Sequence, residues 1–297
     1  MVSNAMLLSV IIPAHNEEKN LEPTVRELAQ TLDAEEIPYE IVIVNDNSSD
    51  DTGRVAEGLA ARDPGIRVVT RTKLGGFGRA VRAGLAVFRG DAVAIVMADS
   101  SDDPRDLVRC YRKLEDGYDC VFGSRFRPGS EMSNYPRKKL VVNRIVNRCI
   151  QWMFWSRFND FTNAFKVYRR DVVLECGPYS SSHFNLTIEM SLSALIRRYH
   201  IAEIPINWYG RTWGATHLFI GAMGRRYLST LLVMFFQKLL IADDILEERL
   251  SERTQMIDRL GGFEDRVAKL EAAVSELREA PHSGSKGSES NAAAERS

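Results

Sequence analysis

The first 125 residues alternate between short apolar runs, rich in Val and Ile, and longer amphipathic segments. The apolar runs are bounded by turn residues and have the length of single strands. Such alternation predicts a mostly parallel β-sheet with helices on both faces, an α/β fold. It also predicts that functional side chains gather at the carboxyl ends of the strands. The expected strands are Leu8–Ile12, Glu40–Asn45, Ile66–Arg71, Ala92–Met97 and Tyr118–Gly123.

The helices between these strands are located by apolar residues at helical spacing. Asp103 followed by Pro104 is a typical helix start, because the first residue caps the helix and proline suits its first turn. The expected helical faces are Leu21, Val25, Leu28 and Leu32; Val81, Leu85 and Phe88; and Leu107, Tyr111 and Leu114. Beyond residue 125 the pattern predicts helices at residues 137–155 and 186–198, and strands at 165–168 and 200–206.

The chain has 297 residues, enough for one large domain with appendages. We expect a catalytic domain over residues 7–224, an amphipathic helix and short coiled coil over residues 225–280, and a disordered tail over residues 281–297. The coiled coil rests on 3-4-3 spacing, and both dimerisation and packing on its own domain are compatible with it. Its residues are Val267, Leu270, Val274 and Leu277.

Charge and cysteine content narrow the function classes. The net charge of −1 provides no basic field for nucleic acid. The four cysteines form no CxxC pair, so we expect single reduced thiols and no zinc site. The N-terminus lacks a signal-peptide pattern. The longest apolar run of the late segment, residues 231–236, is far shorter than the ~20 residues of a spanning helix.

Polar and acidic residues follow three of the expected strands, at residues 13–17, 45–50 and 99–103. Carboxylates at a common sheet edge can bind a base or ribose, or hold a divalent cation near a diphosphate. Each aspartate taken alone is better explained as a turn or cap residue. The position of these polar and acidic residues at three neighbouring strand ends therefore predicts a nucleotide site.

Residues 125–148 contain seven basic side chains and a single acid, Glu131. On a helix, Arg137, Arg144 and Arg148 share one face, and apolar residues share another. Such a basic amphipathic helix suits an anionic membrane surface or a phosphate group. A solvated helix face is the plainer interpretation of the same pattern.

Several motifs resemble those of the family-2 glycosyltransferases of GT-A fold: SVIIPAHNEEKNL, EIVIVNDNSSDDT, a fourth strand ending in Asp, and VFGSRF. Three later segments resemble the polyprenyl-phosphate glycosyltransferases more narrowly, a group that includes dolichyl-phosphate mannosyltransferase: NRIVNR, DFTNAFKVYRR and EIPINWYGRTWGATHL. The resemblance spans residues 7–220. It implies a Rossmann-like mixed sheet, and an enzyme that moves a sugar from a UDP- or GDP-sugar to a polyprenyl or dolichyl phosphate with inversion. Because the late apolar segment is too short to span a membrane and leads into the expected coiled coil, we expect a peripheral protein at the cytoplasmic membrane face.

The resemblance also implies roles for individual residues. The nucleotide would be bound by Pro13, Glu17, Asp46, Asp99 and Arg211. The catalytic residues would be Asp99, Arg125 and Arg211. The acceptor phosphate would be bound by Arg125, Lys139, Asn143 and Arg144, with the Asp160–Lys166 segment closing the same side. A divalent cation, Mg²⁺ or Mn²⁺, would bind at Asp99.

The sequence departs from the family pattern at several positions. Met97 replaces the first carboxylate of the usual D-x-D motif, and Asp102 or Asp103 is the candidate substitute. Thr216 and His217 stand where the family has Ser and Lys, and Asn143 stands where it has Ser. Mg²⁺ keeps several waters and often binds through one or two carboxylates plus substrate phosphates, so the loss of one carboxylate is compatible with metal binding.

Two other functions fit the same residues. A family-2 enzyme could glycosylate a hydroxyl of a soluble or polymeric acceptor, which needs a base such as Glu189 or Asp160. A non-catalytic homologue that binds nucleotide sugar is favoured by Met97 and the coiled coil. A dinucleotide oxidoreductase is disfavoured, because the glycine motif at residues 76–81 lacks its third Gly and follows the third strand.

Overall fold

A computed structural model of the chain describes residues 5–210 and 224–241. The chain divides into two compact units, Met1–Ile241 and Ala242–Ser297, and every described residue belongs to the first. Arg211, the predicted coiled coil and the tail therefore lie outside the described residues.

The elements are β1 (Leu8–Ala14), α1 (Leu21–Ala34), β2 (Tyr39–Asp46), α2 (Thr52–Arg62), β3 (Ile66–Arg71), α3 (Phe77–Leu85), β4 (Ala92–Ile95), α4 (Pro104–Glu115), β5 (Cys120–Ser124), β6 (Met132–Ser133), α5 (Arg137–Phe154), β7 (Lys166–Arg169), α6 (Arg170–Cys176), α7 (Asn185–Ile196), β8 (Ile201–Pro205), β9 (Trp208–Tyr209) and a helix over residues 224–241.

Seven strands form the main sheet, in the order β3-β2-β1-β4-β7-β5-β8. β7 pairs antiparallel with both neighbours, and the other pairings are parallel. This confirms the predicted mostly parallel sheet. Strand order reverses between β1 and β4, and ligands bind at such switch points in open α/β sheets. The carboxyl ends of β1, β2, β4 and β5 lie along one edge.

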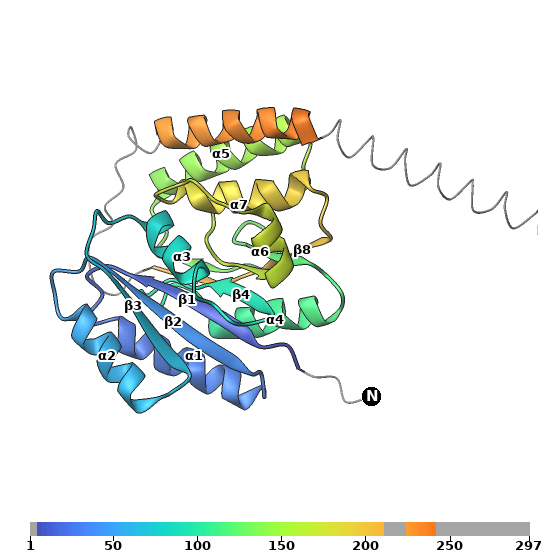
Figure 1. Cartoon of the computed structure of the whole chain (residues 1–297). Coiled ribbons are helices and arrows are strands. Elements are labelled where there is room, and N and C mark those ends of the chain that lie inside the picture. Colours follow the sequence, from blue (N-terminus) through green and yellow to red (C-terminus); the bar gives the residue numbers. More distant parts are fainter. Residues whose placement is uncertain (1–4, 211–223, 242–297) are drawn as a thin grey trace, which may run out of the picture. The chain divides into compact units, whose positions relative to one another are not determined.

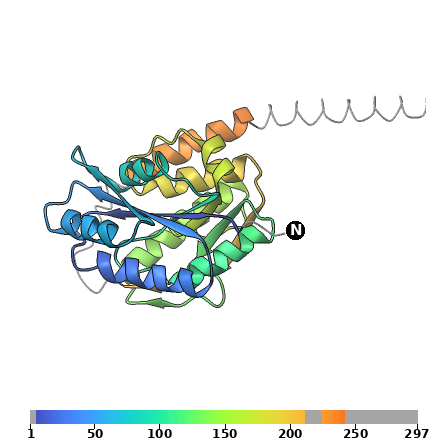
Figure 2. The same cartoon turned by 60° about the horizontal axis from the view of Figure 1, so that its bottom comes forward.

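The central strands are apolar on both faces because helices cover both (Figures 1 and 2). Successive residues of β1 point into opposite cores: Val10 and Ile12 enter one, and Ile11 enters the other. The first core is completed by α1, α2 and α4. The second contains residues of α3, α5, α6, α7 and the helix over residues 224–241, including Leu231 and Met234.

Most predicted elements are confirmed, with shifted ends. The helices near residues 137 and 186 correspond to α5 and α7, and the late strands correspond to β7 and β8. Two predicted ends are wrong. β4 ends at Ile95 rather than Met97, whose backbone N–H binds the side chain of Asp102 at 2.9 Å. α3 ends at Leu85, so Phe88 joins the core from the following turn. The short elements α6, β6 and β9 were not predicted.

Tight turns follow the three strands that end in polar residues. Asn16, Asn47 and Ser100 have φ angles of 57°, 54° and 55°. This left-handed conformation is uncommon for residues other than glycine, although asparagine adopts it more readily than most. The turns reverse the chain directly after β1, β2 and β4, so the polar side chains stay at the sheet edge.

Two further expectations concern cysteines and membrane spans. All four cysteines are free, and three of them are buried, in agreement with the expected single thiols. Among the helices of the described ranges, none is both long and apolar enough to cross a membrane.

Candidate functional site

Asp46, at the end of β2, is the centre of the predicted nucleotide edge. Its buried carboxylate pairs with Arg71 from β3 and accepts the backbone N–H of Gly76 at 2.6 Å. Gly76 has a φ of 154°, and a Cβ atom there would lie 2.5 Å from the carbonyl oxygen of Ser182. Glycine is therefore needed where the loop after β3 approaches Asp46. Sequence reasoning missed Arg71 and this loop, although the adjacent glycines were the available signal.

Pro13 and Glu17 border the same edge. Pro13 pairs with Val44 across β1 and β2. The backbone N–H of Glu17 donates to the hydroxyl of Thr52 at 2.8 Å, and its buried carboxylate accepts from Asn20 at 2.6 Å. The structure thus brings Pro13, Glu17 and Asp46 to neighbouring strand ends.

The acidic loop, residues 97–103, follows β4 at the switch point. Asp99 and Asp102 are both buried there, and Asp99 accepts the N–H of Ser101 at 3.2 Å. Burial raises the pKa of Asp102 to about 7, and repulsion from Asp99 adds to the rise. Asp103 has a different place: it caps α4 by accepting from the backbone N–H of Arg105 at 2.9 Å. Of the two candidate substitutes for the missing carboxylate, Asp102 is the one whose side chain returns to residue 97.

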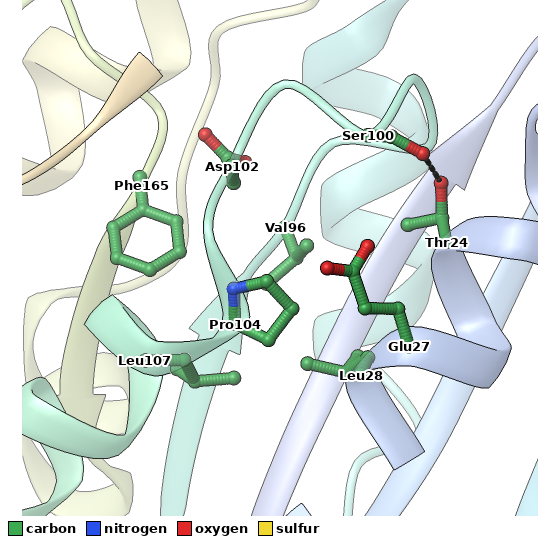
Figure 3. Close-up of a pocket in the computed structure, with 9 residues that line it drawn as sticks. All are labelled: Thr24, Glu27, Leu28, Val96, Ser100, Asp102, Pro104, Leu107 and Phe165. Atoms are coloured by element: carbon green, nitrogen blue, oxygen red, sulfur yellow. Dashed lines mark hydrogen bonds between the residues drawn. The ribbon is translucent and has the colours of Figure 1, made fainter. Parts of the chain in front are cut away.

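A small hollow lies beneath the acidic loop, between α1 and α4 (Figure 3). Its volume is about 10 Å³, which is about the size of one water probe and too small for a substrate. Figure 3 shows the hydrogen bond between the hydroxyls of Ser100 and Thr24, 2.7 Å long, which connects the loop to α1. The hollow is therefore part of the support of the loop.

The acidic loop offers few protein ligands for a divalent cation. Over residues 5–210 and 224–241 there is no group of three or more His, Cys, Asp or Glu side chains suited to hold a metal. Asp99 and Asp102 are close enough for their charges to interact. Two carboxylates plus substrate oxygens are a usual environment for Mg²⁺, and the acidic loop fits that arrangement.

Arg125, directly after β5, forms a buried ion pair with Asp160. Its Nε and Nη2 donate to the two carboxylate oxygens of Asp160, each at 2.8 Å, and its backbone N–H donates at 3.1 Å. Burial acts to raise the pKa of Asp160, but the attraction of Arg125 outweighs it and the net pKa lies below the usual range. Arg125 is only 5% exposed. This bidentate pair orients the guanidinium rigidly.

Lys166 supports the same pair from inside the protein. Its ammonium group is buried and donates to the backbone carbonyls of Phe161 and Asn163. Burial lowers the pKa of Lys166 to about 7, although Asp160 acts in the opposite direction. Lys166 therefore fixes the turn that carries Asp160.

The other predicted acceptor residues lie on α5, against two aromatic rings. Lys139 Nζ lies 5.4 Å from the ring centre of Tyr135, and the Arg144 guanidinium lies 5.0 Å from that of Phe126. Asn143 donates its side-chain amide to the Tyr135 hydroxyl. Together with Arg125 these residues form the basic centre: Arg125, Lys139, Asn143 and Arg144. Sequence reasoning missed both rings.

β9 contacts both the acidic loop, through backbone hydrogen bonds, and the basic centre, through the Trp208 ring, whose centre lies 5.8 Å from Lys139 Nζ. The N–H of Tyr209 donates to the carbonyl of Ser101 at 2.9 Å, and the N–H of Trp208 donates to that of Glu131 at 2.8 Å. Trp208 also forms a β-bridge with Asp102. The positive charge of Arg125 acts on Asp102, where it favours the ionised carboxylate. Negative and positive groups thus border one region at the strand ends.

The two carboxylates considered as bases for a hydroxyl acceptor are both engaged. Asp160 is paired with Arg125. Glu189 accepts from the backbone N–H groups of Ser180 and Ser181, each at 2.8 Å. Glu189 also lines a polar cavity of about 290 Å³ between residues 180–183 and the helix over residues 224–241.

Comparison with known proteins adds independent findings. The family model described as "Glycosyl transferase family 2" matches residues 9–178. The chain is 30% identical, over 215 residues, to the polyprenol monophosphomannose synthase of Mycolicibacterium smegmatis, covering 70% of this chain and 80% of that protein. It is 29% identical, over 224 residues, to the undecaprenyl-phosphate mannosyltransferase of Micrococcus luteus, covering 74% and 90% respectively.

A solved structure resembles the fold. Glucosyl-3-phosphoglycerate synthase from Mycobacterium tuberculosis, crystallised with Mn²⁺, uridine diphosphate and phosphoglyceric acid, superposes with a TM-score of 0.61. The match covers 77% of this chain and 78% of that chain, at 20% sequence identity. It supports the expected GT-A architecture.

Proposed function

Because the chain belongs to glycosyl transferase family 2, we propose that it transfers a sugar from a nucleotide sugar to a polyprenyl phosphate. The observation that carries the proposal is that β9 contacts the acidic loop on one side and Lys139 of the basic centre on the other. The first suits a cation-bridged diphosphate and the second suits an anionic acceptor. The names of the two relatives described above refer to polyprenol monophosphomannose and to undecaprenyl phosphate.

The donor would bind at the edge formed by β1, β2 and β4. Asp46, oriented by Arg71 and Gly76, faces the base, with Pro13 and Glu17 framing the nucleoside. Asp99 lies at the switch point, where the diphosphate would follow. Arg211 lies outside the described residues, and we propose that it approaches the phosphates as its motif implies.

A divalent cation would be held by Asp99 and Asp102, completed by diphosphate oxygens. Bound there, Mg²⁺ or Mn²⁺ would neutralise the charge that develops on the leaving nucleoside diphosphate. Burial is the main cause of the raised pKa of Asp102, and the charge of the nearby Asp99 carboxylate adds to it. The Mn²⁺ in the structural neighbour supports this part of the proposal.

The acceptor needs no strong base, because a phosphate is already anionic near neutral pH. A phosphate oxygen attacks the anomeric carbon from the side opposite the diphosphate, and the bond from that carbon to the diphosphate oxygen breaks with inversion. Lys139 and Arg144 would bind the acceptor while Arg125, held by Asp160, fixes its direction. The engagement of Glu189 and Asp160 weighs against a hydroxyl acceptor.

Two helices expose apolar side chains that suit contact with a membrane surface. On α5, Ile145 and Trp152 are 58% and 79% exposed. On the helix over residues 224–241, Phe236 and Leu240 are 60% and 69% exposed. Exposed apolar residues beside basic ones are typical of interfacial helices on anionic lipids. We propose peripheral attachment at the cytoplasmic face through these two helices.

Vesicle sedimentation tests the membrane contact. Trp152→Ser and Phe236→Ser should each reduce binding to vesicles that contain anionic lipid. Leu174→Ser, which removes an equally exposed leucine from α6, is the matched control and should leave binding unchanged. Equal binding of all three variants and the wild type would show that the helices do not dock there.

Asp99→Asn tests the reaction itself. Purified protein is incubated with labelled UDP- or GDP-sugars and a short polyprenyl phosphate, with and without Mg²⁺ or Mn²⁺. We expect labelled product to partition into organic solvent and the variant to lose this activity. Label appearing only in water-soluble product would indicate a hydroxyl acceptor, and nucleotide-sugar binding without turnover would indicate a non-catalytic homologue.

A further inference from the structure

Tyr135 lies in the middle of the basic centre and contacts three of its four members. Its phenolic oxygen accepts from Arg125 Nη1 at 3.3 Å and from the side-chain amide of Asn143. Its ring centre lies 5.4 Å from Lys139 Nζ and 5.6 Å from the Arg125 guanidinium carbon. Phe126, the other ring at the basic centre, contacts Arg125 and Arg144 but bears no polar group.

The two hydrogen bonds of the Tyr135 phenol do not use its own hydrogen. A phenol has one hydrogen to donate and can also accept. Both bonds just described use the oxygen as acceptor. The cationic side chains next to the ring, Arg125 and Lys139, have no lone pair to receive the hydrogen. A group that does accept it, and that also tolerates two positive neighbours, is an anionic oxygen.

The ring of Tyr135 is also fixed in place. It contacts Trp208 edge to face, with ring centres 4.8 Å apart. Lys139 Nζ lies 5.8 Å from the Trp208 ring centre, so the two rings border the ammonium together. Cations over aromatic faces are held by the electrostatic field of the ring. Since Trp208 belongs to β9, the phenol is anchored to the strand that joins the acidic loop to the basic centre.

We propose that Tyr135 is a direct ligand of the acceptor phosphate, donating its O–H to a phosphate oxygen that Lys139 also meets. The ring meanwhile keeps the Lys139 ammonium and the Arg125 guanidinium in position. This inference rests on the proposed function, because it specifies how the acceptor of that reaction is held.

The protonation of Tyr135 agrees with this role. Burial raises the pKa of Tyr135 above its ordinary value, and the opposing influence of Arg125 does not cancel the rise. The phenol therefore keeps its hydrogen at neutral pH. An O–H donated to a phosphate oxygen is a charge-assisted hydrogen bond, which is among the stronger ones in proteins.

Tyr135→Phe isolates the hydroxyl, since the ring and its contacts with Lys139 and Trp208 remain. Tyr118→Phe is the matched control, because Tyr118 stacks on His200 beyond the opposite end of β5. Calorimetric titration of the full chain with farnesyl phosphate, farnesol, inorganic phosphate and the nucleotides UDP and GDP measures the acceptor and donor sites separately. Steady-state kinetics then gives KM for each substrate.

We expect Tyr135→Phe to weaken farnesyl phosphate binding about 10- to 100-fold, the usual effect of losing a hydrogen bond to a charged group. The KM of the acceptor should rise while nucleotide affinity and the KM of the donor stay unchanged. Tyr118→Phe should behave as the wild type. Unchanged farnesyl phosphate affinity in Tyr135→Phe overturns the proposal, and so does an equal loss of nucleotide affinity, which would indicate a general structural role.

The measurements also separate this inference from the proposed function. If the wild type binds farnesyl phosphate but transfers no sugar to it, the proposed reaction fails, and the binding data alone decide the role of Tyr135. If farnesyl phosphate binds no more tightly than farnesol, the anion site is refuted together with Tyr135. Inorganic phosphate that binds as tightly as farnesyl phosphate, and loses affinity in Tyr135→Phe, supports the ligand role with a free phosphate as its source.

Discussion

Replacing Asp160 by Asn should destabilise the fold strongly, because it leaves Arg125 buried without a counter-charge. The two side chains are nearly inaccessible to solvent, and Arg125 makes three hydrogen bonds to the carboxylate. Removing one partner of such a buried pair costs about 3–5 kcal/mol of unfolding free energy. For a chain of this size, that lowers the melting temperature by about 6–20 °C.

The loss of stability in Asp160→Asn should also depend on pH. The pKa of Asp160 is lowered in the folded state, so its contribution is complete above the unfolded pKa and is lost as the pH falls through the folded value. The difference in stability between wild type and Asp160→Asn should therefore shrink as the pH falls below about 4.

Urea unfolding followed by tryptophan fluorescence measures this difference directly. Asp116→Asn is the matched control, because it breaks an exposed pair with Lys113 and should cost at most about 1 kcal/mol. A loss in Asp160→Asn no larger than that of the control would refute the reasoning, since it would mean that Arg125 is solvated despite the pair.

Three further predictions concern other parts of the fold. The pKa of Lys166 is lowered to about 7 in the folded protein, so above pH 7 the unfolded chain binds more protons and the free energy of unfolding should rise up to about pH 10. Lys166→Met should flatten that rise in urea titrations, and an unchanged slope would show that Lys166 is charged when folded. At Gly78 a Cβ atom would lie 2.5 Å from the carbonyl oxygen of Ser181, so Gly78→Ala should lower the melting temperature and nucleotide affinity together, whereas Gly58→Ala, where a Cβ atom meets nothing within 4 Å, should lower neither. Leu28→Ala removes a buried side chain between α1 and the sheet, and should cost about 2–5 kcal/mol in chemical unfolding; a loss below about 1 kcal/mol would show that this core collapses around the gap.

The sequence predicts the first half of the fold well, because its strands are buried on both faces. β1 and β2 are mostly apolar, and every residue of the two strands except Tyr39 is buried; helical spacing between them is clear. The elements it missed are short: β6 and β9 have two residues each and are defined by the pairing of Met132 with Trp208, far apart in the chain, rather than by local pattern. α6 has seven residues, too few for a reliable helical period.

The site was predictable where chemistry is concentrated at strand ends. Asp46 ends β2, and Asp99 and Arg125 follow β4 and β5; these three strands run in the same direction, so their carboxyl ends lie at one edge of the sheet. Side chains that act through long-range contacts were not predictable. Arg71 reaches Asp46 because β3 lies beside β2.

Aromatic support was equally hidden from the sequence. Tyr135 meets Trp208 only because β6 pairs with β9, and a lone aromatic residue in a loop has no local signature of its role. The apolar face expected on α5 is present, but the structure leaves Ile145 and Trp152 exposed rather than packed.

The most direct test of the account is transfer of labelled sugar from UDP- and GDP-sugars to a short polyprenyl phosphate, by wild type and Asp99→Asn, with and without Mg²⁺ or Mn²⁺. We expect the wild type to form metal-dependent, solvent-extractable product from at least one donor, and Asp99→Asn to lose this product. Extractable product formed equally well by Asp99→Asn, or without any divalent cation, would contradict the role given to the acidic loop. The absence of transfer from every donor, with nucleotide binding intact, would contradict the reaction itself.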